Sequence, residues 1–227
     1  MSTITLGTEC KESVEAESQE STVSRNESAS SKRRNVKGDC DAVDSHLRAK
    51  DYLTESEMER FLHASKRGKF GVRDYAMLLV CFRHGLRVSE LCGLRTADLD
   101  LDSGHLWIRR LKGSLSTQQP ISADESRALR AWLRERSLLK HSHRPELFLS
   151  SQGPFTRQAI NYLVAQTGER AGLGHCWPHQ LRHSCGYALA NRKVDFRVMQ
   201  DTLGHVNPTH TSHYTRTSAS RFEGIWD

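Results

Sequence analysis

Two histidines, an arginine and a tyrosine in the last quarter of the chain have the chemistry of a catalytic site. They are His179, Arg182, His205 and Tyr214. His179 and Arg182 are three residues apart, so they share one face if this stretch is helical. A guanidinium stays charged at working pH and presents a planar fork of donors that matches phosphate oxygens. A phenol oxygen can attack an activated electrophile and hold it as an ester, so the set predicts phosphoryl chemistry with Tyr214 as the nucleophile.

Two more basic residues earlier in the chain fit the same chemistry. Arg87 follows an apolar run that ends at Gly85, a position from which a charge can be aimed into a cleft. Glu90, three residues later, can orient Arg87 through an ion pair. Lys112 is expected at the tip of a turn, where it can donate a proton or contact a phosphate. Taken singly, Arg87 also fits a simple ion pair, and Lys112 also fits a solvated surface lysine.

A metal site is the alternative interpretation of the histidines, because His179 and His183 have the i, i+4 spacing of zinc ligands on a helix. Pro178 suits the first position of that helix, which removes His175 from its face. No acidic residue lies between His179 and His183, and the HExxH motif is absent from the sequence. We therefore predict no metal and no cofactor. The other histidines of this region are interpreted as structural or surface groups: His175, His183, His210 and His213.

Helices are predicted for most of the elements that position these side chains. Capping residues followed by periodic apolar positions predict a helix after each of Thr54, Ser122 and Thr156. Residues 72–84 are apolar nearly all round, which predicts a buried central helix. Gly85 is expected to end this helix in a left-handed turn.

The reactive residues near the end of the chain are expected on three further helices. Pro178 predicts the start of a helix that carries His179 in its first turn. Residues 195–203 predict a second helix, ended by a glycine, and residues 210–217 predict a short helix that carries Tyr214.

Residues 103–121 have the alternating pattern of strands rather than the period of a helix. Leu106, Ile108 and then Leu111 are strand-like, with Trp107 and Arg109 alternating to the other face. Lys112 is expected at the hairpin tip. The predicted fold class is therefore mainly α with a small antiparallel β-hairpin or meander.

Charge is unevenly distributed along the 227 residues. Residues 1–45 hold six basic and nine acidic side chains, a net charge of −3, and the remainder holds 27 and 18, a net charge of +9. A basic body fits a polyanionic partner such as a nucleic acid, and charge alone fits a solvated basic surface as well. Residues 1–48 are polar and lack periodic apolar positions, so we predict a disordered N-terminal tail.

The sequence also bears on the cellular compartment. No apolar run reaches the length of a membrane span, and the first residues lack the apolar core of a signal peptide. The six cysteines form no CxxC pair, which predicts reduced thiols rather than a zinc ribbon or a disulfide framework. We expect a cytoplasmic protein that does not contact the membrane.

Four sequence blocks resemble the motifs of tyrosine recombinases, the phage integrase family. The blocks are GLRVSEL at residues 85–91, RLKG at 110–113, PHQLRHS at 178–184, and Leu203-Gly204-His205 followed by Tyr214. The likeness extends over roughly residues 50–227 and is greatest to the short fimbrial phase-variation recombinases, the FimB and FimE group. It implies a tyrosine recombinase catalytic domain over residues 49–227, without the N-terminal core-binding domain that most members carry.

The resemblance implies that three of these residues contact the scissile phosphate of DNA and that a fourth supports one of them. Arg87 and Arg182 would bind its non-bridging oxygens, and His205 would add a hydrogen bond. Glu90 would support Arg87.

The resemblance also assigns the bond-making and bond-breaking steps. Tyr214 would attack the phosphate and form a 3′-phosphotyrosyl ester, with His179 assisting the transfer of its proton. Lys112 would protonate the departing 5′ oxygen. Because the ester keeps the free energy of the broken bond, rejoining would need neither ATP nor a metal.

The implied partners are double-stranded DNA with inverted-repeat sites, three further copies in a homo-tetramer on DNA, and DNA-bending accessory proteins in the bacterial nucleoid. The implied outcome is inversion of a promoter-bearing segment. An integrase or excisionase of a mobile element and a type IB topoisomerase share the chemistry. A non-catalytic DNA-binding regulator is the alternative of another class. It would be expected to lack some of the six residues assigned to catalysis, and all six are present: Arg87, Lys112, His179, Arg182, His205 and Tyr214.

The final apolar residues are expected to dock on the parent domain or on a neighbouring protomer: Phe222, Ile225 and Trp226.

Overall fold

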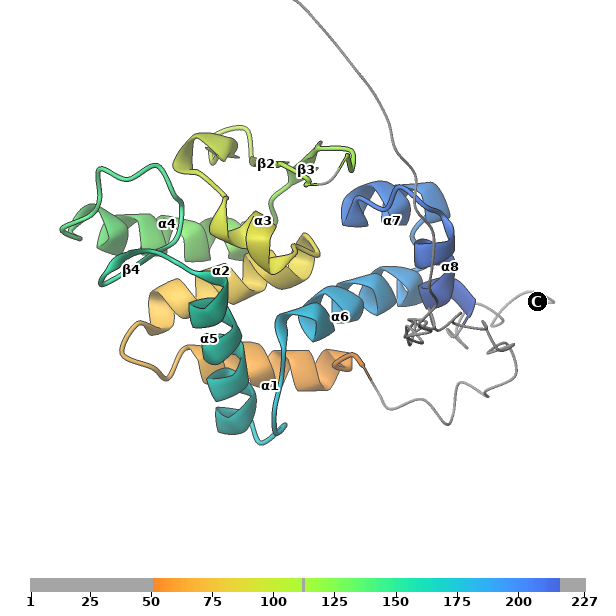
Figure 1. The fold of residues 1–227 in the computed structure, drawn as a ribbon, viewed down its shortest axis with the longest axis horizontal. Helices are drawn as coiled ribbons and strands as arrows, with labels where there is room; N and C mark the ends of the chain where they lie inside the picture. The colour runs from red at the N-terminus through yellow and green to blue at the C-terminus, as the bar shows by residue number, and fades with distance from the viewer. Residues whose placement is uncertain (1–50, 112, 217–227) are drawn as a thin grey trace, which may run out of the picture. The chain divides into compact units, whose positions relative to one another are not determined.

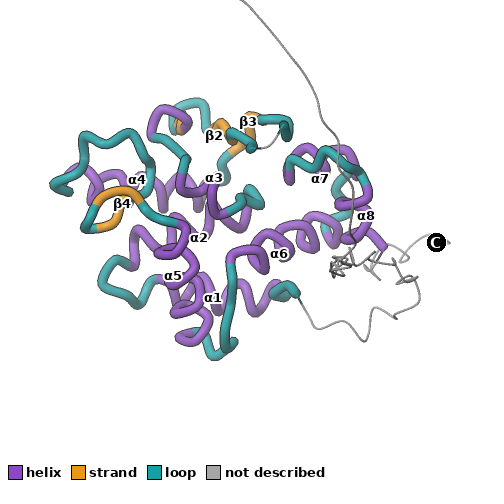
Figure 2. Tube along the Cα trace, viewed as in Figure 1, coloured by secondary structure: helices purple, strands orange, loops and turns teal. Residues whose placement is uncertain are grey.

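Helices make up most of the structure, and the strands form two small antiparallel sheets (Figures 1 and 2). The structure is a computed structural model that describes residues 51–111 and 113–216, without the side chain of Arg216. The predicted tail (residues 1–48), Lys112 and the apolar C-terminal residues lie outside the described residues. The predicted fold class is confirmed.

Eight α-helices lie in the described ranges. They are α1 (Glu55–Ser65), α2 (Gly71–Arg83), α3 (Val88–Cys92), α4 (Ala123–Ser137), α5 (Arg157–Arg170), α6 (Pro178–Asn191), α7 (Phe196–Leu203) and α8 (Thr209–Arg216). One sheet has the order β1 (Leu99–Asp100), β2 (His105–Ile108), β3 (Thr117–Pro120), and the other pairs β4 (Leu149–Ser150) with β5 (Gly153–Pro154).

The helix starts follow local capping chemistry. At α1 the Thr54 hydroxyl accepts a hydrogen bond from the backbone N–H of Glu57, and the Glu57 carboxylate accepts one from the backbone N–H of Thr54. Ser122 begins α4 in a capping box, and the Thr156 hydroxyl accepts from the Ala159 N–H at the start of α5. Such caps each stabilise a helix by about 1 kcal/mol. The three starts predicted from the sequence are confirmed.

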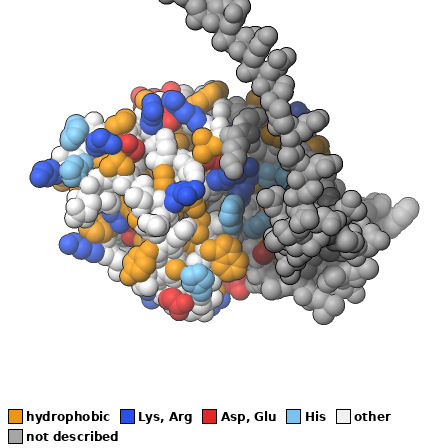
Figure 3. All heavy atoms as spheres, viewed as in Figure 1, with side chains coloured by type: hydrophobic (Ala, Val, Ile, Leu, Met, Phe, Trp, Pro, Cys, Tyr) orange, Lys and Arg blue, Asp and Glu red, His pale blue; other side chains and the backbone are white. Residues whose placement is uncertain are grey.

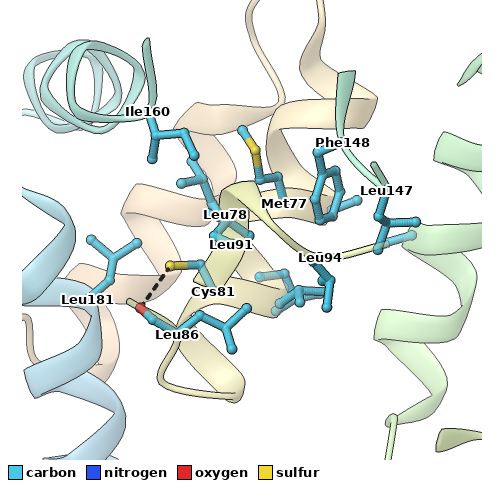
Figure 4. Close-up of a cluster of buried hydrophobic side chains, with 14 of the residues drawn as sticks. Met77, Leu78, Cys81, Leu86, Leu91, Leu94, Leu147, Phe148, Ile160 and Leu181 are labelled. Atoms are coloured by element: carbon cyan, nitrogen blue, oxygen red, sulfur yellow. Dashed lines mark hydrogen bonds between the residues drawn. The ribbon is translucent and has the colours of Figure 1, made fainter. Parts of the chain in front are cut away.

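The predicted central helix is α2, which packs against α1, α4 and α6. Figure 4 shows Met77, Leu78 and Cys81 of this helix close to Leu181 of α6 and Ile160 of α5. All five of these side chains are buried. The helix ends as expected, because Gly85 in the following turn has a left-handed backbone with φ 54°.

The predicted hairpin is a three-stranded meander. Leu106 and Ile108 on β2 are buried, and Trp107 between them is 42% exposed, as the alternation predicts. Leu111 is a correction, since β2 ends at Ile108 and Leu111 is 45% exposed. The ladder ends there because the backbone N–H of Arg110 donates to the hydroxyl of Ser116 instead of a strand carbonyl.

The last three helices form a second apolar cluster. The buried residues of this cluster are Cys185, Tyr187, Ala190, Met199, Leu203 and Tyr214. Tyr214 of α8 lies on α6 at Gly186, where a Cβ would approach three atoms of its ring to 2.7 Å. The close packing of α8 on α6 thus depends on a residue without a side chain.

The expectations about cysteines and about membrane-spanning segments can be compared with the described residues. Cys81, Cys92, Cys176 and Cys185 are free thiols. Within residues 51–111 and 113–216, no helix combines the length and the apolar composition needed to cross a membrane.

Candidate active site

Arg182 joins the ends of two helices that are distant in sequence. It lies in α6 and is 4% exposed. Its guanidinium donates to the backbone carbonyl of Gly85, just after α2, and to that of Leu203 at the end of α7, the latter at 2.6 Å. Burial, with added repulsion from Arg87 and Arg110, lowers the pKa of Arg182 to about 10. The group therefore keeps its charge at neutral pH in a nearly dry position.

The carboxylate of Glu90 holds two arginines at the start of α3. Its oxygens accept from the Arg87 guanidinium at 2.8 Å, from the Arg87 backbone N–H at 2.9 Å and from the Arg110 guanidinium at 2.7 Å. Burial alone would raise the pKa of Glu90, but the charge of Arg110 and the bonds from Arg87 outweigh it and lower this pKa. Glu90 is thus an ionised anchor, and the predicted ion pair with Arg87 is present.

Arg110 is a site residue that reasoning from single positions missed. Its side chain is fully buried and also donates to the carbonyls of His84 at 2.8 Å, Gly85 at 3.4 Å and Thr202. A signal was present in the alternation, because residues 106, 108 and 110 point to the same buried face. A charge on such a face needs several partners, and this one fixes the end of β2 against α3.

The arginines leave an excess of positive charge in the site. Arg87 and Arg110 pair with the carboxylate of Glu90, whereas Arg182 donates to main-chain carbonyls and is influenced by Glu90 through its charge. His179 lies near them, since burial and then the charges of Arg182 and Arg87 lower its pKa. Figure 3 shows Lys and Arg side chains next to His side chains on one face. An anion such as a phosphate group would neutralise this excess.

His205 is held neutral beside the predicted nucleophile. Its Nδ1 lies 2.9 Å from the hydroxyl of Thr211, and its ring stacks on the ring of Tyr214 with centroids 6.2 Å apart. Burial, followed by the charge of Arg182, lowers the pKa of His205 to about 3. With Nδ1 occupied, Nε2 is the nitrogen available to a ligand.

The phenol of Tyr214 is buried and holds its proton tightly. Tyr214 is 3% exposed, and burial raises its pKa to about 12 although the charge of Arg182 opposes the shift. Its hydroxyl lies 3.0 Å from Nδ1 of His183. His183, interpreted from the sequence as a structural or surface group, therefore contacts the candidate nucleophile through its imidazole. The ring of His179 lies one turn away, with its centroid 6.5 Å from that of His183.

Comparison with known proteins settles the family. Residues 51–221 match the model of the phage integrase family. The chain belongs to the phage integrase family. It is a tyrosine site-specific recombinase, and the resemblance drawn from its four motif blocks is confirmed.

Curated relatives of this recombinase include two fimbrial regulators. Type 1 fimbriae regulatory protein FimB of Escherichia coli (strain K12) is 44% identical over 180 residues, which cover 78% of this chain and 90% of FimB. Type 1 fimbriae regulatory protein FimE of the same strain is 42% identical over 179 residues, with the same shares. The expected likeness to the FimB and FimE group is confirmed.

A solved structure shows the same recombinase fold. The crystal structure of XerA recombinase superposes with a TM-score of 0.69 and 29% identity, over 78% of this chain and 62% of the XerA chain. This recombinase therefore spans less than two thirds of XerA.

Five of the six predicted catalytic residues converge in this recombinase. The charge of Arg182 bears on the pKa values of His179, His205 and Tyr214, and Arg87 bears on that of Arg182, so the five lie within electrostatic range of one another. Lys112 falls between β2 and β3 in the sequence and lies outside the described residues. Within residues 51–111 and 113–216, no group of three or more His, Cys, Asp or Glu side chains is arranged to hold a metal ion.

Proposed function

We propose that this recombinase cleaves and rejoins double-stranded DNA at inverted-repeat sites through a 3′-phosphotyrosyl ester on Tyr214, and so inverts a promoter-bearing segment. The observation that carries the chemical part is the excess positive charge of Arg87 and Arg182 beside the buried phenol of Tyr214. The likeness to FimB and FimE, named as fimbrial regulators, supports the inversion of a regulatory segment.

The arginines act on the charge that develops at phosphorus. As Tyr214 attacks, negative charge grows on the two non-bridging oxygens, and donors already aimed at them stabilise the transition state more than the ground state. Arg182 has two N–H groups fixed by main-chain carbonyls, and Glu90 fixes Arg87. Nε2 of His205 supplies a further hydrogen bond to the same phosphate.

Proton transfer accompanies both halves of the reaction. His179 assists the loss of the proton from Tyr214, and Lys112 protonates the departing 5′ oxygen. The 5′ hydroxyl of a partner strand then attacks the ester, and the phenol leaves. The number of phosphodiester bonds is unchanged, so the reaction requires no ATP, and Arg87 and Arg182 can neutralise the phosphate charge without a metal ion.

The proposed assembly is a homo-tetramer on two DNA sites in the bacterial cytoplasm, at the nucleoid, with DNA-bending proteins as accessory partners. The net charge of +9 on the chain after residue 45 supports a DNA partner. Residues 49–227 form the catalytic domain in this proposal, and residues 1–48 form a polar tail.

The test is recovery of the covalent adduct from DNA of the host. We expect the wild-type protein to leave a 3′ end attached to Tyr214, and sequencing of the trapped ends to show a pair of inverted repeats. Tyr214→Phe removes the phenol oxygen alone, so the adduct should vanish while DNA binding persists. Tyr162→Phe is the matched control, because Tyr162 lies on α5 and is 69% exposed.

The products of the same reaction discriminate the remaining alternatives. Inversion of the segment between the mapped sites supports the proposal. Excision or integration of a circle would indicate the recombinase of a mobile element, and simple relaxation of supercoils would indicate a topoisomerase. A covalent adduct formed by Tyr214→Phe would exclude Tyr214 as the nucleophile.

A further inference from the structure

A carboxylate, an imidazole and the phenol of Tyr214 form a line of three groups. The Tyr214 hydroxyl lies 3.0 Å from Nδ1 of His183. On the far side of the same ring, Nε2 lies 3.9 Å from the carboxylate of Asp51. The three residues come from different parts of the chain, namely α8, α6 and the segment before α1.

Among the described residues, His183 is the base within hydrogen-bond distance of the phenol oxygen. His205 stacks its ring on that of Tyr214, but its Nδ1 is directed to Thr211. His213 meets the Tyr214 ring edge-on, with centroids 5.7 Å apart. A general base must lie about 2.6–3.2 Å from the proton-bearing atom, and His183 satisfies this distance.

We propose that His183 is the general base that takes the proton of Tyr214 during DNA cleavage and returns it during ligation, and that Asp51 positions the ring of His183. This inference rests on the proposed function of Tyr214 as the nucleophile. It adds a residue to the reaction, because His179 was assigned the transfer of this proton and His183 was assigned none.

The proton can be followed through both steps. In cleavage, the Tyr214 oxygen forms its bond to phosphorus, its proton moves to Nδ1 of His183, and the bond from phosphorus to the 5′ oxygen breaks. That oxygen takes a proton from the general acid, assigned above to Lys112. In ligation, the 5′ hydroxyl attacks phosphorus and gives up its proton to that acid, while Nδ1 of His183 returns a proton to the departing phenol.

Asp51 selects the tautomer that this transfer requires. Nδ1 can accept the phenol proton only when the ring hydrogen is on Nε2, and a carboxylate on the Nε2 side favours that hydrogen. A carboxylate that orients a catalytic histidine works by the same principle in serine proteases. At 3.9 Å the contact between Asp51 and His183 is electrostatic rather than a direct hydrogen bond.

The charges around His183 keep it available as a base. Burial lowers its pKa, Asp51 opposes this shift, and His179, His213 and Arg182 lower the pKa further. The ring is therefore neutral at neutral pH. With a pKa of about 12, only about one Tyr214 phenol in 10⁵ would ionise unaided at pH 7. A neighbouring base that removes the proton can therefore raise the rate of cleavage greatly.

The first test is single-turnover cleavage of a duplex that carries the mapped site. A nick close to the cleavage point lets the short fragment with the released 5′ hydroxyl diffuse away, so that the strand is not rejoined. His183→Asn keeps an amide near the position of Nδ1 that can accept the phenol hydrogen bond, but the amide cannot carry the proton away. We expect cleavage to slow by about 10²–10⁴-fold, with melting temperature and DNA affinity close to wild type. His63→Asn, an exposed histidine on α1, is the matched control. Cleavage at the wild-type rate by His183→Asn would overturn the proposal.

A second substrate separates the base from the acid. When sulfur replaces the bridging 5′ oxygen, the leaving group departs as a thiolate and needs no proton. We expect this substrate to rescue Lys112→Ala but not His183→Asn. Equal rescue of both would place His183 on the leaving-group side and overturn the proposal. An adduct formed by Tyr214→Phe on either substrate would instead defeat the proposed nucleophile.

The third test uses Asp51 and remains decisive if His183→Asn folds poorly. The wild-type rate should rise with pH as the imidazolium of His183 loses its proton. Asp51 raises the pKa of His183, so Asp51→Asn should move this limb of the profile to lower pH. Glu55→Gln is the control, because Glu55 pairs instead with exposed Arg192. If the rise of the rate with pH does not move in Asp51→Asn, the positioning role of Asp51 is excluded. If this rise persists in His183→Asn, His183 is excluded as the general base.

Discussion

Arg182 carries its charge among main-chain carbonyls rather than in water. At 4% exposure, its guanidinium donates to Gly85 and to Leu203, and a planar fork is needed to reach both. A lysine ammonium has the same charge but is a point donor on a flexible stem. The residue type matters here through geometry as much as through charge.

Arg182→Lys should therefore lose activity while keeping the charge. We expect single-turnover cleavage to fall by about 10²–10³-fold, the usual loss when one transition-state donor is removed. A carbonyl left without its donor should also destabilise the fold by about 1–3 kcal/mol. Cleavage assays and urea denaturation measure the two effects. Arg134→Lys on the exposed face of α4 is the control, and wild-type cleavage by Arg182→Lys would contradict the role of the fork.

His205 predicts how stability depends on pH. Its pKa falls from 6.5 to about 3 on folding, so the unfolded chain binds more protons between these values. The contribution of His205 to the free energy of unfolding should be fully present above pH 6.5 and should decline as the pH falls toward 3. His205→Asn lacks this titration, and its melting temperature should fall less than that of the wild type between pH 7 and 4. Parallel melting curves against pH for the two proteins would contradict the buried neutral imidazole.

At the scale of elements, two glycines set how closely the helices of the site approach. Gly204 ends α7 with φ 64°, and a Cβ there would lie 2.9 Å from the side chain of Arg110. Gly186 lies inside α6, where the ring of Tyr214 occupies the place of a Cβ. The position of the nucleophile therefore depends on α6 as well as on its own helix.

Gly186→Ala should separate stability from activity. Alanine favours the helix by about 1 kcal/mol relative to glycine, but its Cβ would lie 2.7 Å from the Tyr214 ring and must displace it. We expect a melting temperature within a few degrees of wild type and a much slower formation of the covalent adduct. Gly93→Ala is the control, since a Cβ there meets its nearest atom at 3.4 Å. An unchanged adduct yield from Gly186→Ala would show that the buried position of Tyr214 is not required.

The elements could be predicted from the sequence because their signals are local. Thr54, Ser122 and Pro178 each begin a helix within a few residues of the pattern that announces it. The contact of His183 with Tyr214 spans 31 positions and depends on how α8 packs on α6. No local pattern distinguishes His183 from His179, which lies on the same face one turn earlier. The partners of Arg110 likewise come from three separate elements.

At the scale of the whole molecule, the proposed mechanism has the arginines supply the positive charge that a metal ion would otherwise bring to a phosphate. Arg87 and Arg182 stay charged at any working pH, and the proposed ester on Tyr214 would store the bond free energy. We expect cleavage and rejoining to persist in excess EDTA and without ATP. Gel analysis of recombined products in the two buffers measures this. Loss of cleavage on chelation, restored by a divalent ion, would revive the metal interpretation of His179 and His183.

The anchoring of Arg182 on the ends of α2 and α7 has a consequence for the DNA products. A guanidinium fixed by two main-chain carbonyls cannot follow a phosphate displaced by one nucleotide, which is a rise of about 3.4 Å along the DNA axis. Each site should therefore be cut at a single phosphate, and the two staggered cuts should leave overhangs of constant length. Ends of constant length anneal to one another without trimming or filling, so the joined segment neither gains nor loses a nucleotide.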